Sequence, residues 1–283
     1  MEGAAAEAAA AAELLDVMEM PFSARTEVET GVSRYVFYFE TESEAKAAAA
    51  TLDAARGGWR EAGVTLSAPV ITTLLKEDWT EVWKRHFAVQ RISPTLVIRP
   101  SWLEHVAAPG ETVIDLDPGM SFGTGAHETT QFCLKAIEEL AAGGGKSFLD
   151  AGCGSGILTI AAVKFGCSPT VCFDNDPECL ETTKENLARN EIPQERVGIF
   201  VGGLEAFEPG RQFDLVVANI ISSVLIANTA RLASWVAPGG HLIVAGILAR
   251  EYAELREAFL SAGLVEIKSG TEKDWTGGVF SRR

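Results

Sequence analysis

Three glycines alternate with other residues in the stretch Asp150-Ala151-Gly152-Cys153-Gly154-Ser155-Gly156. The apolar run 147–149 precedes this stretch, and an apolar helical pattern over 156–165 follows it. Glycines spaced in this way permit a tight turn and let a ligand approach the backbone closely. Because ligands of open α/β sheets bind beyond the carboxyl ends of the strands, the stretch predicts a strand, a turn, a helix and a ligand site.

Working outward, strand patterns alternate with helix patterns from residue 111 to the end of the sequence. The expected strands are 113–116, 147–151, 170–173, 197–201, 214–218, 241–245, 265–269 and 278–281, and the expected helices are 128–142, 156–165, 177–190, 222–236 and 251–262. This alternation predicts an α/β fold with a mostly parallel, doubly wound, Rossmann-like sheet. The last two strands have no helix between them, which predicts a terminal hairpin.

Asp174 helps to separate two classes of nucleotide cofactor. It stands 22 residues beyond Gly152, at the end of the next expected strand, where a carboxylate can accept hydrogen bonds from both hydroxyls of a ribose. A dinucleotide fingerprint would need a third glycine at position 157, which is Ile157. The spacing D-x-G-x-G-x-G is instead the pattern of S-adenosylmethionine-dependent methyltransferases. A nicotinamide enzyme and a non-catalytic binding module with the same fold are the alternatives.

Asn219 follows the expected strand 214–218, in Val216-Val217-Ala218-Asn219-Ile220-Ile221. Methyltransferases that act on nitrogen often place an Asn or Asp at this point, facing the methyl donor and the amine. Asn219 is therefore the predicted catalytic residue. The alternative is that it caps the helix expected from Ser222, since Asn is a good helix cap.

The most distinctive stretch is a loop before the glycine-rich turn, Asp117-Pro118-Gly119-Met120-Ser121-Phe122-Gly123-Thr124-Gly125-Ala126-His127-Glu128-Thr129-Thr130. Its glycines permit unusual backbone angles and loop motion. Phe122 offers an apolar surface, and Thr130 falls in the first turn of the next helix, where hydroxyls and free N–H groups can hold the polar end of a ligand. His127 could accept a proton, although a histidine at the start of a helix more often has a structural role.

With this loop and the glycine-rich turn in view, the chain resembles the bacterial ribosomal protein L11 methyltransferase (PrmA) family over roughly residues 76–283. The stretches that carry the resemblance are Asp117–Thr130, Asp150–Gly156 with Ile157-Leu158, Asp174-Asn175-Asp176-Pro177, Asn219-Ile220, Glu77-Asp78-Trp79 through Trp83-Lys84, Arg99-Pro100-Ser101-Trp102 and Ala245-Gly246-Ile247-Leu248. The resemblance implies a protein N-methyltransferase. Its substrate would be the lysine side chains or the N-terminal amine of ribosomal protein L11, free or in the large subunit.

The resemblance also implies a set of residues that bind S-adenosylmethionine; from the spacing of cysteine and histidine we expect no metal site. Thr130, Gly152, Asp174 and Asn219 match donor-binding positions of the family, and we expect Gly154 and Phe122 to join them. In this interpretation Asp174 holds the ribose and the glycines hold the amino-acid portion of the donor. One departure is Ile221-Ser222, where the family usually has Leu-Ala.

A second departure concerns residues 1–72, which we expect to form a small α+β substrate-recognition domain. Their pattern is helix 4–18, strands 23–29 and 32–40, helix 42–56 and strand 64–72. This order predicts a ferredoxin-like domain that lacks its first strand. Residues 73–110 would be a connector, and 111–283 the methyltransferase domain. A shortened first domain leaves open an alternative function, a methyltransferase of the same fold that acts on another protein or a small amine.

Composition limits the partners of this chain. Its 283 residues include 24 Lys and Arg against 39 Asp and Glu, a formal net charge of −15, which argues against a nucleic-acid binder that works by general basicity. Residues 1–72 hold 5 basic and 12 acidic side chains, a net −7, and could steer a basic partner.

The five cysteines form no C-x-x-C pair, which argues against zinc. Without a signal peptide or an apolar run of roughly 18 residues, we expect a cytoplasmic monomer that binds no membrane.

Overall fold

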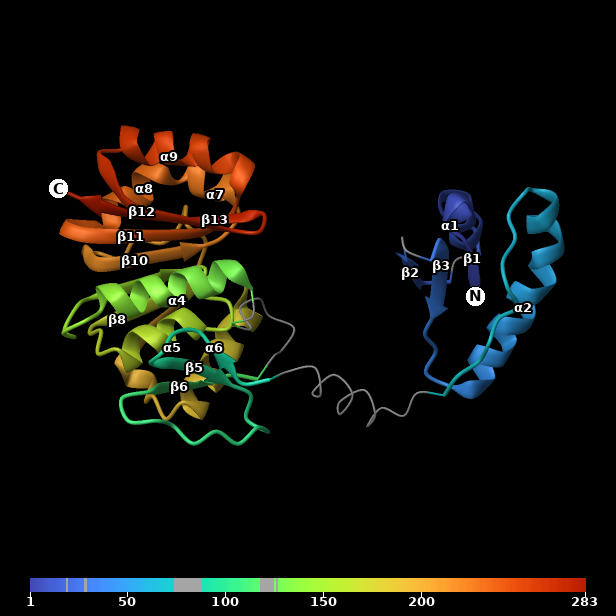
Figure 1. The fold of residues 1–283 in the computed structure, drawn as a ribbon, viewed down its shortest axis with the longest axis horizontal. Helices are drawn as coiled ribbons and strands as arrows, with labels where there is room; N and C mark the ends of the chain where they lie inside the picture. Colours follow the sequence, from blue (N-terminus) through green and yellow to red (C-terminus); the bar gives the residue numbers. More distant parts are fainter. Residues whose placement is uncertain (19, 28–29, 74–87, 118–124, 126) are drawn as a thin grey trace. The chain divides into compact units, whose positions relative to one another are not determined.

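The computed structural model describes the chain except for residues 19, 28–29, 74–87, 118–124 and 126. The chain divides into two compact units, Met1–Arg85 and His86–Arg283 (Figure 1). The expected division into 1–72, 73–110 and 111–283 stays a prediction. The short amphipathic helix expected around Trp79 and Trp83 lies outside the described residues.

The first unit contains a small antiparallel sheet packed against two helices. Its elements are β1 (Glu2–Ala4), α1 (Ala8–Asp16), β2 (Phe22–Glu27), β3 (Val32–Phe37) and α2 (Glu42–Glu61). The strand order is β1-β3-β2, and an isolated antiparallel bridge joins Gly3 to Leu66 beside β1. The chain order β-α-β-β-α, followed by this bridge, matches a ferredoxin-like arrangement.

The prediction that this unit lacks its first strand is therefore wrong. Strand β1 pairs with β3 through Glu2 opposite Arg34, and these two side chains also form an ion pair of 2.8 Å. The alanine run directly after residue 3 has a strong helix propensity, which hides a short strand whose pairing partner lies some 30 residues away. The expected strand 64–72 shrinks to the single bridge at Leu66.

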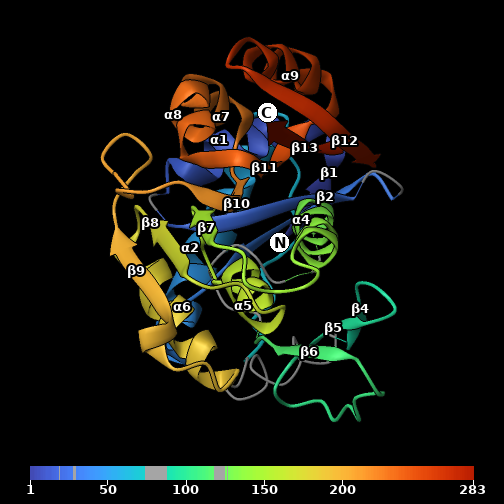
Figure 2. The ribbon, with the colours of Figure 1, turned by 90° about the vertical axis from the view of Figure 1, so that its left-hand side faces the viewer.

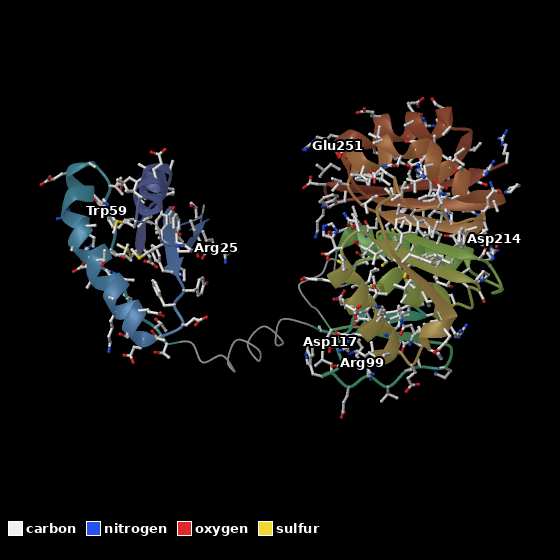
Figure 3. All side chains as sticks on the ribbon, turned by 180° about the vertical axis from the view of Figure 1, so that it is seen from behind. Arg25, Trp59, Arg99, Asp117, Asp214 and Glu251 are labelled. Carbon is white, nitrogen blue, oxygen red and sulfur yellow. The ribbon has the colours of Figure 1, made fainter. Side chains whose placement is uncertain are left out.

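A compact apolar cluster holds the first unit together. Leu15 from α1, Tyr35 from β3, and Leu52 and Trp59 from α2 are all buried in it. Figure 3 labels Trp59 on α2. Helix α2 begins with a capping box, in which Thr41 Oγ1 accepts from the Glu44 N–H and Glu44 Oε2 accepts from the Thr41 N–H. Such a cap satisfies two helix-end donors and fixes where α2 begins.

The second unit is built on a sheet of seven strands, in the order β12-β13-β11-β10-β7-β8-β9 (Figure 2). The strands are β7 (Phe148–Ala151), β8 (Thr170–Asp174), β9 (Val197–Val201), β10 (Phe213–Asn219), β11 (Val236–Leu248), β12 (Leu264–Glu272) and β13 (Trp275–Arg282). Neighbours pair in parallel except where β13 meets β11 and β12. The doubly wound sheet and the terminal hairpin are confirmed.

Helices cover both faces of this sheet (Figure 2). One apolar cluster gathers α4 (Glu128–Leu140), α5 (Ile157–Lys164) and α6 (Pro177–Arg189), and the other gathers α7 (Ser222–Ala227), α8 (Thr229–Trp235) and α9 (Tyr252–Ser261). Alternate residues of one strand point to opposite clusters: Leu215 and Val217 lie in the first, and Val216 and Ala218 in the second. In place of the single helix expected over 222–236, the structure has two short helices, α7 and α8.

None of the described helices is long and apolar enough to cross a membrane.

A separate three-stranded sheet precedes the main one. It contains β4 (Gln90–Arg91), β5 (Leu96–Arg99) and β6 (Thr112–Asp115) in that order. Residues 113–116 were expected to join the main sheet, and this prediction is wrong, because β6 pairs in parallel with β5. Four residues of which three are apolar identify a strand but not its partner, and here the partner is the fully buried Leu96–Val97 segment of the expected connector.

Candidate active site

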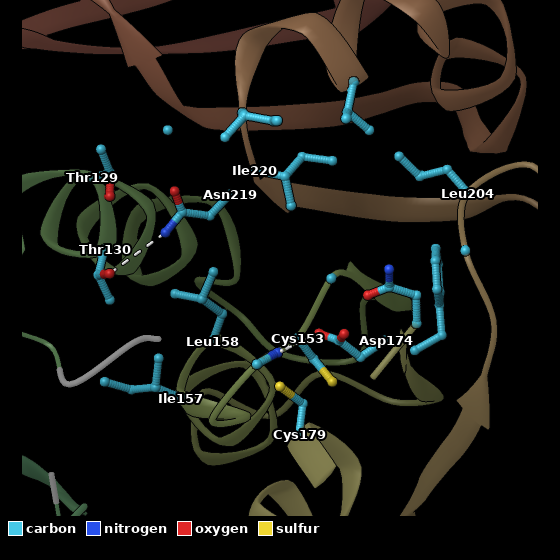
Figure 4. A pocket seen from close by; sticks show the side chains of 18 of the residues that line it. Thr129, Thr130, Cys153, Ile157, Leu158, Asp174, Cys179, Leu204, Asn219 and Ile220 are labelled. Carbon is cyan, nitrogen blue, oxygen red and sulfur yellow. Dashed lines mark hydrogen bonds between the residues drawn. The ribbon is translucent and has the colours of Figure 1, made fainter. Parts of the chain in front are cut away.

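A cavity of about 580 Å³ opens at the carboxyl ends of β7, β8 and β10, where an open α/β sheet is expected to bind its ligand. The sequence-predicted residues that line it are Thr130, Gly152, Gly154, Asp174 and Asn219. Phe122 lies outside the described residues. Thr130 and Asn219 lie at one end of the cavity and Asp174 and Leu204 at the other, with Leu158 and Ile220 between them (Figure 4).

At one end, the carboxylate of Asp174 is held in place by backbone donors. Its Oδ2 accepts from the Gly154 N–H at 2.9 Å, and its Oδ1 accepts from the Asp176 N–H at 3.0 Å. A carboxylate has about four lone-pair positions, so both oxygens keep the capacity to accept from a ligand. The side chain therefore offers a fixed pair of acceptors at the end of β8.

The glycine-rich turn passes close under the opposite wall of the cavity. Gly152 has φ +80°, and a Cβ added there would lie 2.8 Å from Cγ2 of Ile220. A side chain at position 152 would therefore meet both a strained backbone and a steric clash. Glycine is therefore needed at position 152. Ile220, which directly follows β10, lies so close to the turn that no side chain fits between them.

At the other end, one described residue forms a hydrogen bond with the amide of Asn219. Its Nδ2 donates to Oγ1 of Thr130 at 3.4 Å. Its Oδ1 is buried, and no group of the described residues donates to it. The N-cap of α7 is Ile221, so Asn219 does not cap that helix. The structure thus removes the alternative role of Asn219 and leaves an acceptor oxygen beside the cavity.

His127 lines the same end but is occupied as a helix cap. It is the N-cap of α4, and its Nδ1 accepts from the Thr129 N–H and lies 2.8 Å from Thr129 Oγ1. Its ring packs edge-on against Trp275, with ring centroids 5.0 Å apart. These contacts give His127 the structural role that the sequence favoured over that of a base.

Asp150, at the start of the glycine-rich turn, is a buried acid next to the cavity. Its Oδ2 accepts from Thr159 Oγ1 at 2.7 Å, whereas its Oδ1 is bonded to no described residue. Burial raises the pKa of Asp150 to about 7, and the negative charge of Asp174 adds to this rise. The turn therefore begins at a carboxyl group whose charge is costly in this environment.

Some cavity residues carry no signal that the sequence alone revealed. Trp275, Cys179, Leu204 and Glu205 line the cavity, but none belongs to a motif. Leu204 and Glu205 follow the end of β9, and Trp275 begins β13. Leu204, Glu205 and Trp275 share only a position next to a strand terminus, and the strand order decides which of these termini meet; Cys179 lies in the first turn of α6.

The cavity fits the donor that the sequence predicts. Its volume is in the range of sites for small molecules, a fixed carboxylate stands where a ribose would be held, and the buried Oδ1 of Asn219 has no donor among the described residues. Within the described part of the chain, no three His, Cys, Asp or Glu residues are grouped to hold a metal ion. The five cysteines are free thiols.

The doubly wound sheet, its single antiparallel strand β13 and the glycine-rich turn beneath a carboxylate define the class of S-adenosylmethionine-dependent methyltransferases. The family model described as ribosomal protein L11 methyltransferase (PrmA) matches residues 2–283. The chain belongs to this family, is an enzyme, and uses S-adenosylmethionine as its methyl donor.

Individual relatives agree with the family assignment. A protein named ribosomal protein L11 methyltransferase from Geobacter metallireducens is 43% identical over 208 residues, which span 74% of this chain and 67% of that protein. A protein of the same name from Chloroflexus aurantiacus is 38% identical over 248 residues, 79% of this chain and 75% of the relative. The crystal structure of a ribosomal protein L11 methylase from Lactobacillus delbrueckii subsp. bulgaricus covers 70% of this chain and 100% of its own, with TM-score 0.64 and 30% identity.

Proposed function

We propose that this chain transfers methyl groups from S-adenosylmethionine to amines of ribosomal protein L11, in the cytoplasm. The observation that carries the proposal is the buried Oδ1 of Asn219, which no described residue satisfies at the end of the cavity opposite Asp174 (Figure 4). A buried acceptor without a donor is costly. An amine N–H from a substrate would satisfy it, whereas a carbon acceptor, which has no polar hydrogen, would not.

Five of the predicted site residues have a proposed part in binding the donor. Asp174 would hold the ribose hydroxyls, Gly152 and Gly154 the amino-acid portion through their backbone, and Thr130 and Phe122 the side of the cofactor that faces the loop. When bound, S-adenosylmethionine supplies an electrophilic methyl group on a sulfonium sulfur. The chain itself contributes a preorganised cavity, because Asp174 and Asn219 are already held by hydrogen bonds.

The amine must be neutral to act as a nucleophile, and the ordinary pKa of a lysine is about 10.4. A closed apolar cavity lowers that pKa because it disfavours the ammonium form. Leu158 and Ile220 line the middle of this cavity and would exclude water from it. Asn219 Oδ1 would accept an N–H of the neutral amine and so turn its lone pair toward the donor. Orientation of this kind is worth several kcal/mol.

Methylation of another protein or a small amine was the alternative, because the first domain was expected to lack a strand. The structure contains that strand as β1, so this reason for the alternative no longer holds. The same finding supports the proposal that residues 1–72 form a complete small domain for substrate recognition.

The test is a transfer assay with S-adenosylmethionine labelled on its methyl group and unmethylated L11, both free and in large ribosomal subunits. We expect label on L11, located on lysine or N-terminal amines by mass spectrometry. Asn219→Ala should lower turnover by about a hundredfold, since it removes a positioning contact, while donor affinity measured by calorimetry changes little. Label on other proteins, with none on L11, would reject the proposed substrate.

A further inference from the structure

Trp275 provides an aromatic wall at the same end of the cavity as Asn219. It lines the cavity and packs against His127, which is bonded to Thr129, while the next residue Thr130 accepts from Asn219. A short series of contacts therefore links the indole ring to the acceptor amide. Of the described aromatic side chains, the others lining this cavity are His127 and the deeply buried Phe173.

The position of Trp275 is fixed from several sides. It pairs with Leu248 across the β11–β13 ladder, and the Ala249 N–H donates to the carbonyl of the preceding residue, Asp274, at 2.8 Å. Lys273, in the same hairpin turn, forms an ion pair with Glu128 in the first turn of α4. The hairpin is thus tied to the helix that carries His127, and the backbone of Trp275 is fixed where its ring packs against His127.

The aromatic wall formed by Trp275 can contact methylated amines, which Asn219 cannot bind by a hydrogen bond once their N–H groups are lost. A neutral primary amine has two N–H groups and can donate to Asn219 Oδ1. Each methylation replaces one N–H with a methyl group, and a neutral dimethylamine has none left to donate. An amine that has already gained methyl groups therefore needs an apolar or aromatic surface in place of a hydrogen-bond acceptor, and methylated ammonium ions bind well to aromatic faces.

Resting on the proposed function, we propose that Trp275 is a specificity-determining residue that holds acceptor amines already carrying methyl groups. Asn219 positions the unmethylated amine, and Trp275 takes over as N–H groups are lost. The rate of transfer should then depend more strongly on Trp275 as the acceptor amine carries more methyl groups. The affinity for S-adenosylmethionine should not depend on Trp275.

The test compares two acceptors, unmodified L11 and L11 whose amines have been converted to dimethylamines by reductive methylation. We expect the wild-type chain to methylate both. Trp275→Leu should lower the rate on the dimethylated protein about tenfold more than the first methyl transfer to unmodified L11, the loss expected of one aromatic contact to the positive charge that develops on the nitrogen during transfer. Trp275→Phe, which keeps an aromatic face, should retain most of that activity.

A binding measurement provides a readout that does not depend on turnover. Choline has three N-methyl groups and a positive charge, and 3,3-dimethyl-1-butanol is its neutral match in shape. Saturation-transfer NMR should detect choline on the wild-type chain more strongly than the neutral alcohol, and this preference should fall in Trp275→Leu. Calorimetry should show equal donor affinity in the two proteins, and thermal unfolding should confirm that the variant folds.

The outcomes separate the two proposals. No transfer to either form of L11 would reject the proposed function. In that case the difference in choline binding between wild type and Trp275→Leu would still test whether Trp275 binds methylated amines. Transfer to unmodified L11 alone by the wild-type chain, or an equal loss on both acceptors in Trp275→Leu, would overturn the role of Trp275. So would a choline signal that is the same in wild type and variant.

Discussion

At the scale of single residues, the site depends on polar side chains whose partners were invisible in the sequence. Asp174 was expected from its place at the end of a strand, but the backbone donors Gly154 and Asp176 that fix it come from the turns around it. Asn219 was expected from the same kind of position, and its partner Thr130 lies 89 residues away in the sequence. The residue types were predictable because chemistry requires them, whereas their orientation depends on these contacts.

Replacing Asp174 tests its proposed contact with the ribose. Asp174→Ala should weaken donor binding by about 10- to 100-fold, since hydrogen bonds to a charged group are each worth roughly 1.5–3 kcal/mol. Isothermal calorimetry with S-adenosylmethionine measures the change. Glu181→Ala, at an exposed ion pair on α6, is the control and should bind normally. Unchanged affinity in Asp174→Ala would contradict the assignment.

Asp150 should make the stability of the second unit depend on pH. Its pKa of about 7 in the folded chain lies above the ordinary value of 3.8. Between these two pH values the folded chain keeps a proton that the unfolded chain has lost, so stability falls as pH rises, by up to about 1.4 kcal/mol per pH unit. Denaturant unfolding at pH 5 and pH 7 should show a smaller decrease in Asp150→Asn than in the wild type.

Asp214 is the matched control, because its shift has the opposite sign. The hydroxyl and N–H of Ser147 donate to its carboxylate and lower its pKa. Asp214 lies near the start of β10 (Figure 3) and is not among the residues that line the cavity. Its contribution is present above the unfolded pKa and is lost as pH falls through the folded one. Asp214→Asn should therefore lower stability at pH 7 and leave the decrease due to Asp150 in place. Identical pH profiles for wild type and Asp150→Asn would contradict the burial argument.

At the scale of elements, the ends of β10 and β11 meet closely beside the cavity. Gly246, in β11, has φ +84°, and a Cβ there would lie 2.6 Å from the carbonyl oxygen of Ile220. Parallel pairing of Asn219 with Ala245 brings the two strand ends to this contact. The position of the Asn219 amide is therefore set partly by a glycine in the neighbouring strand.

Two glycines of β11 separate the effect of that contact from the effect of backbone strain. Gly239 also has a positive φ, +76°, but a Cβ there would meet nothing within 4 Å. Gly239→Ala should cost about 1–2 kcal/mol in a denaturant titration and leave turnover nearly unchanged. Gly246→Ala should add a displacement of Ile220 and lower turnover by about a hundredfold, as a misplacement near 1 Å does. Equal turnover in the two variants would show that the contact does not position Asn219.

Elements were predicted well where a pattern is long and local, and poorly where it is short. Helix α6 begins at Pro177 as expected, because Asp176 accepts from the Glu178 N–H and caps it. Strand β1 was missed because three residues give no period, and β6 was assigned to the wrong sheet because its partner β5 was hidden in an expected connector.

At the scale of the whole molecule, charge is the property that the sequence measures directly. Residues 1–72 carry a net charge of −7, and the same stretch holds the small sheet with its complete first strand. An acidic module suits a basic ribosomal protein, since complementary charge raises the rate of encounter. This gives the acidity a proposed use beyond solubility.

The dependence of KM on salt tests this steering. Raising salt from about 0.05 M to about 0.3 M shortens the screening length to several Å, so KM for L11 should rise several-fold. KM for S-adenosylmethionine, whose proposed site is a cavity of the second unit, should stay nearly constant and serves as the internal control. If KM for L11 does not change with salt, the acidic residues of 1–72 do not steer the substrate, and their role is limited to solubility.

The sequence by itself determined the class of this protein. Three local signals carried it: the glycine spacing from Asp150 to Gly156, an acid at the end of the next strand and an asparagine at position 219. Local signals of this kind can be recognised without knowledge of the fold. The tertiary structure decided what lies next to what: β1 beside β3, Thr130 against Asn219, and Trp275 against His127. These contacts join residues far apart in the chain, and packing selects them from many pairings that the sequence pattern permits equally well.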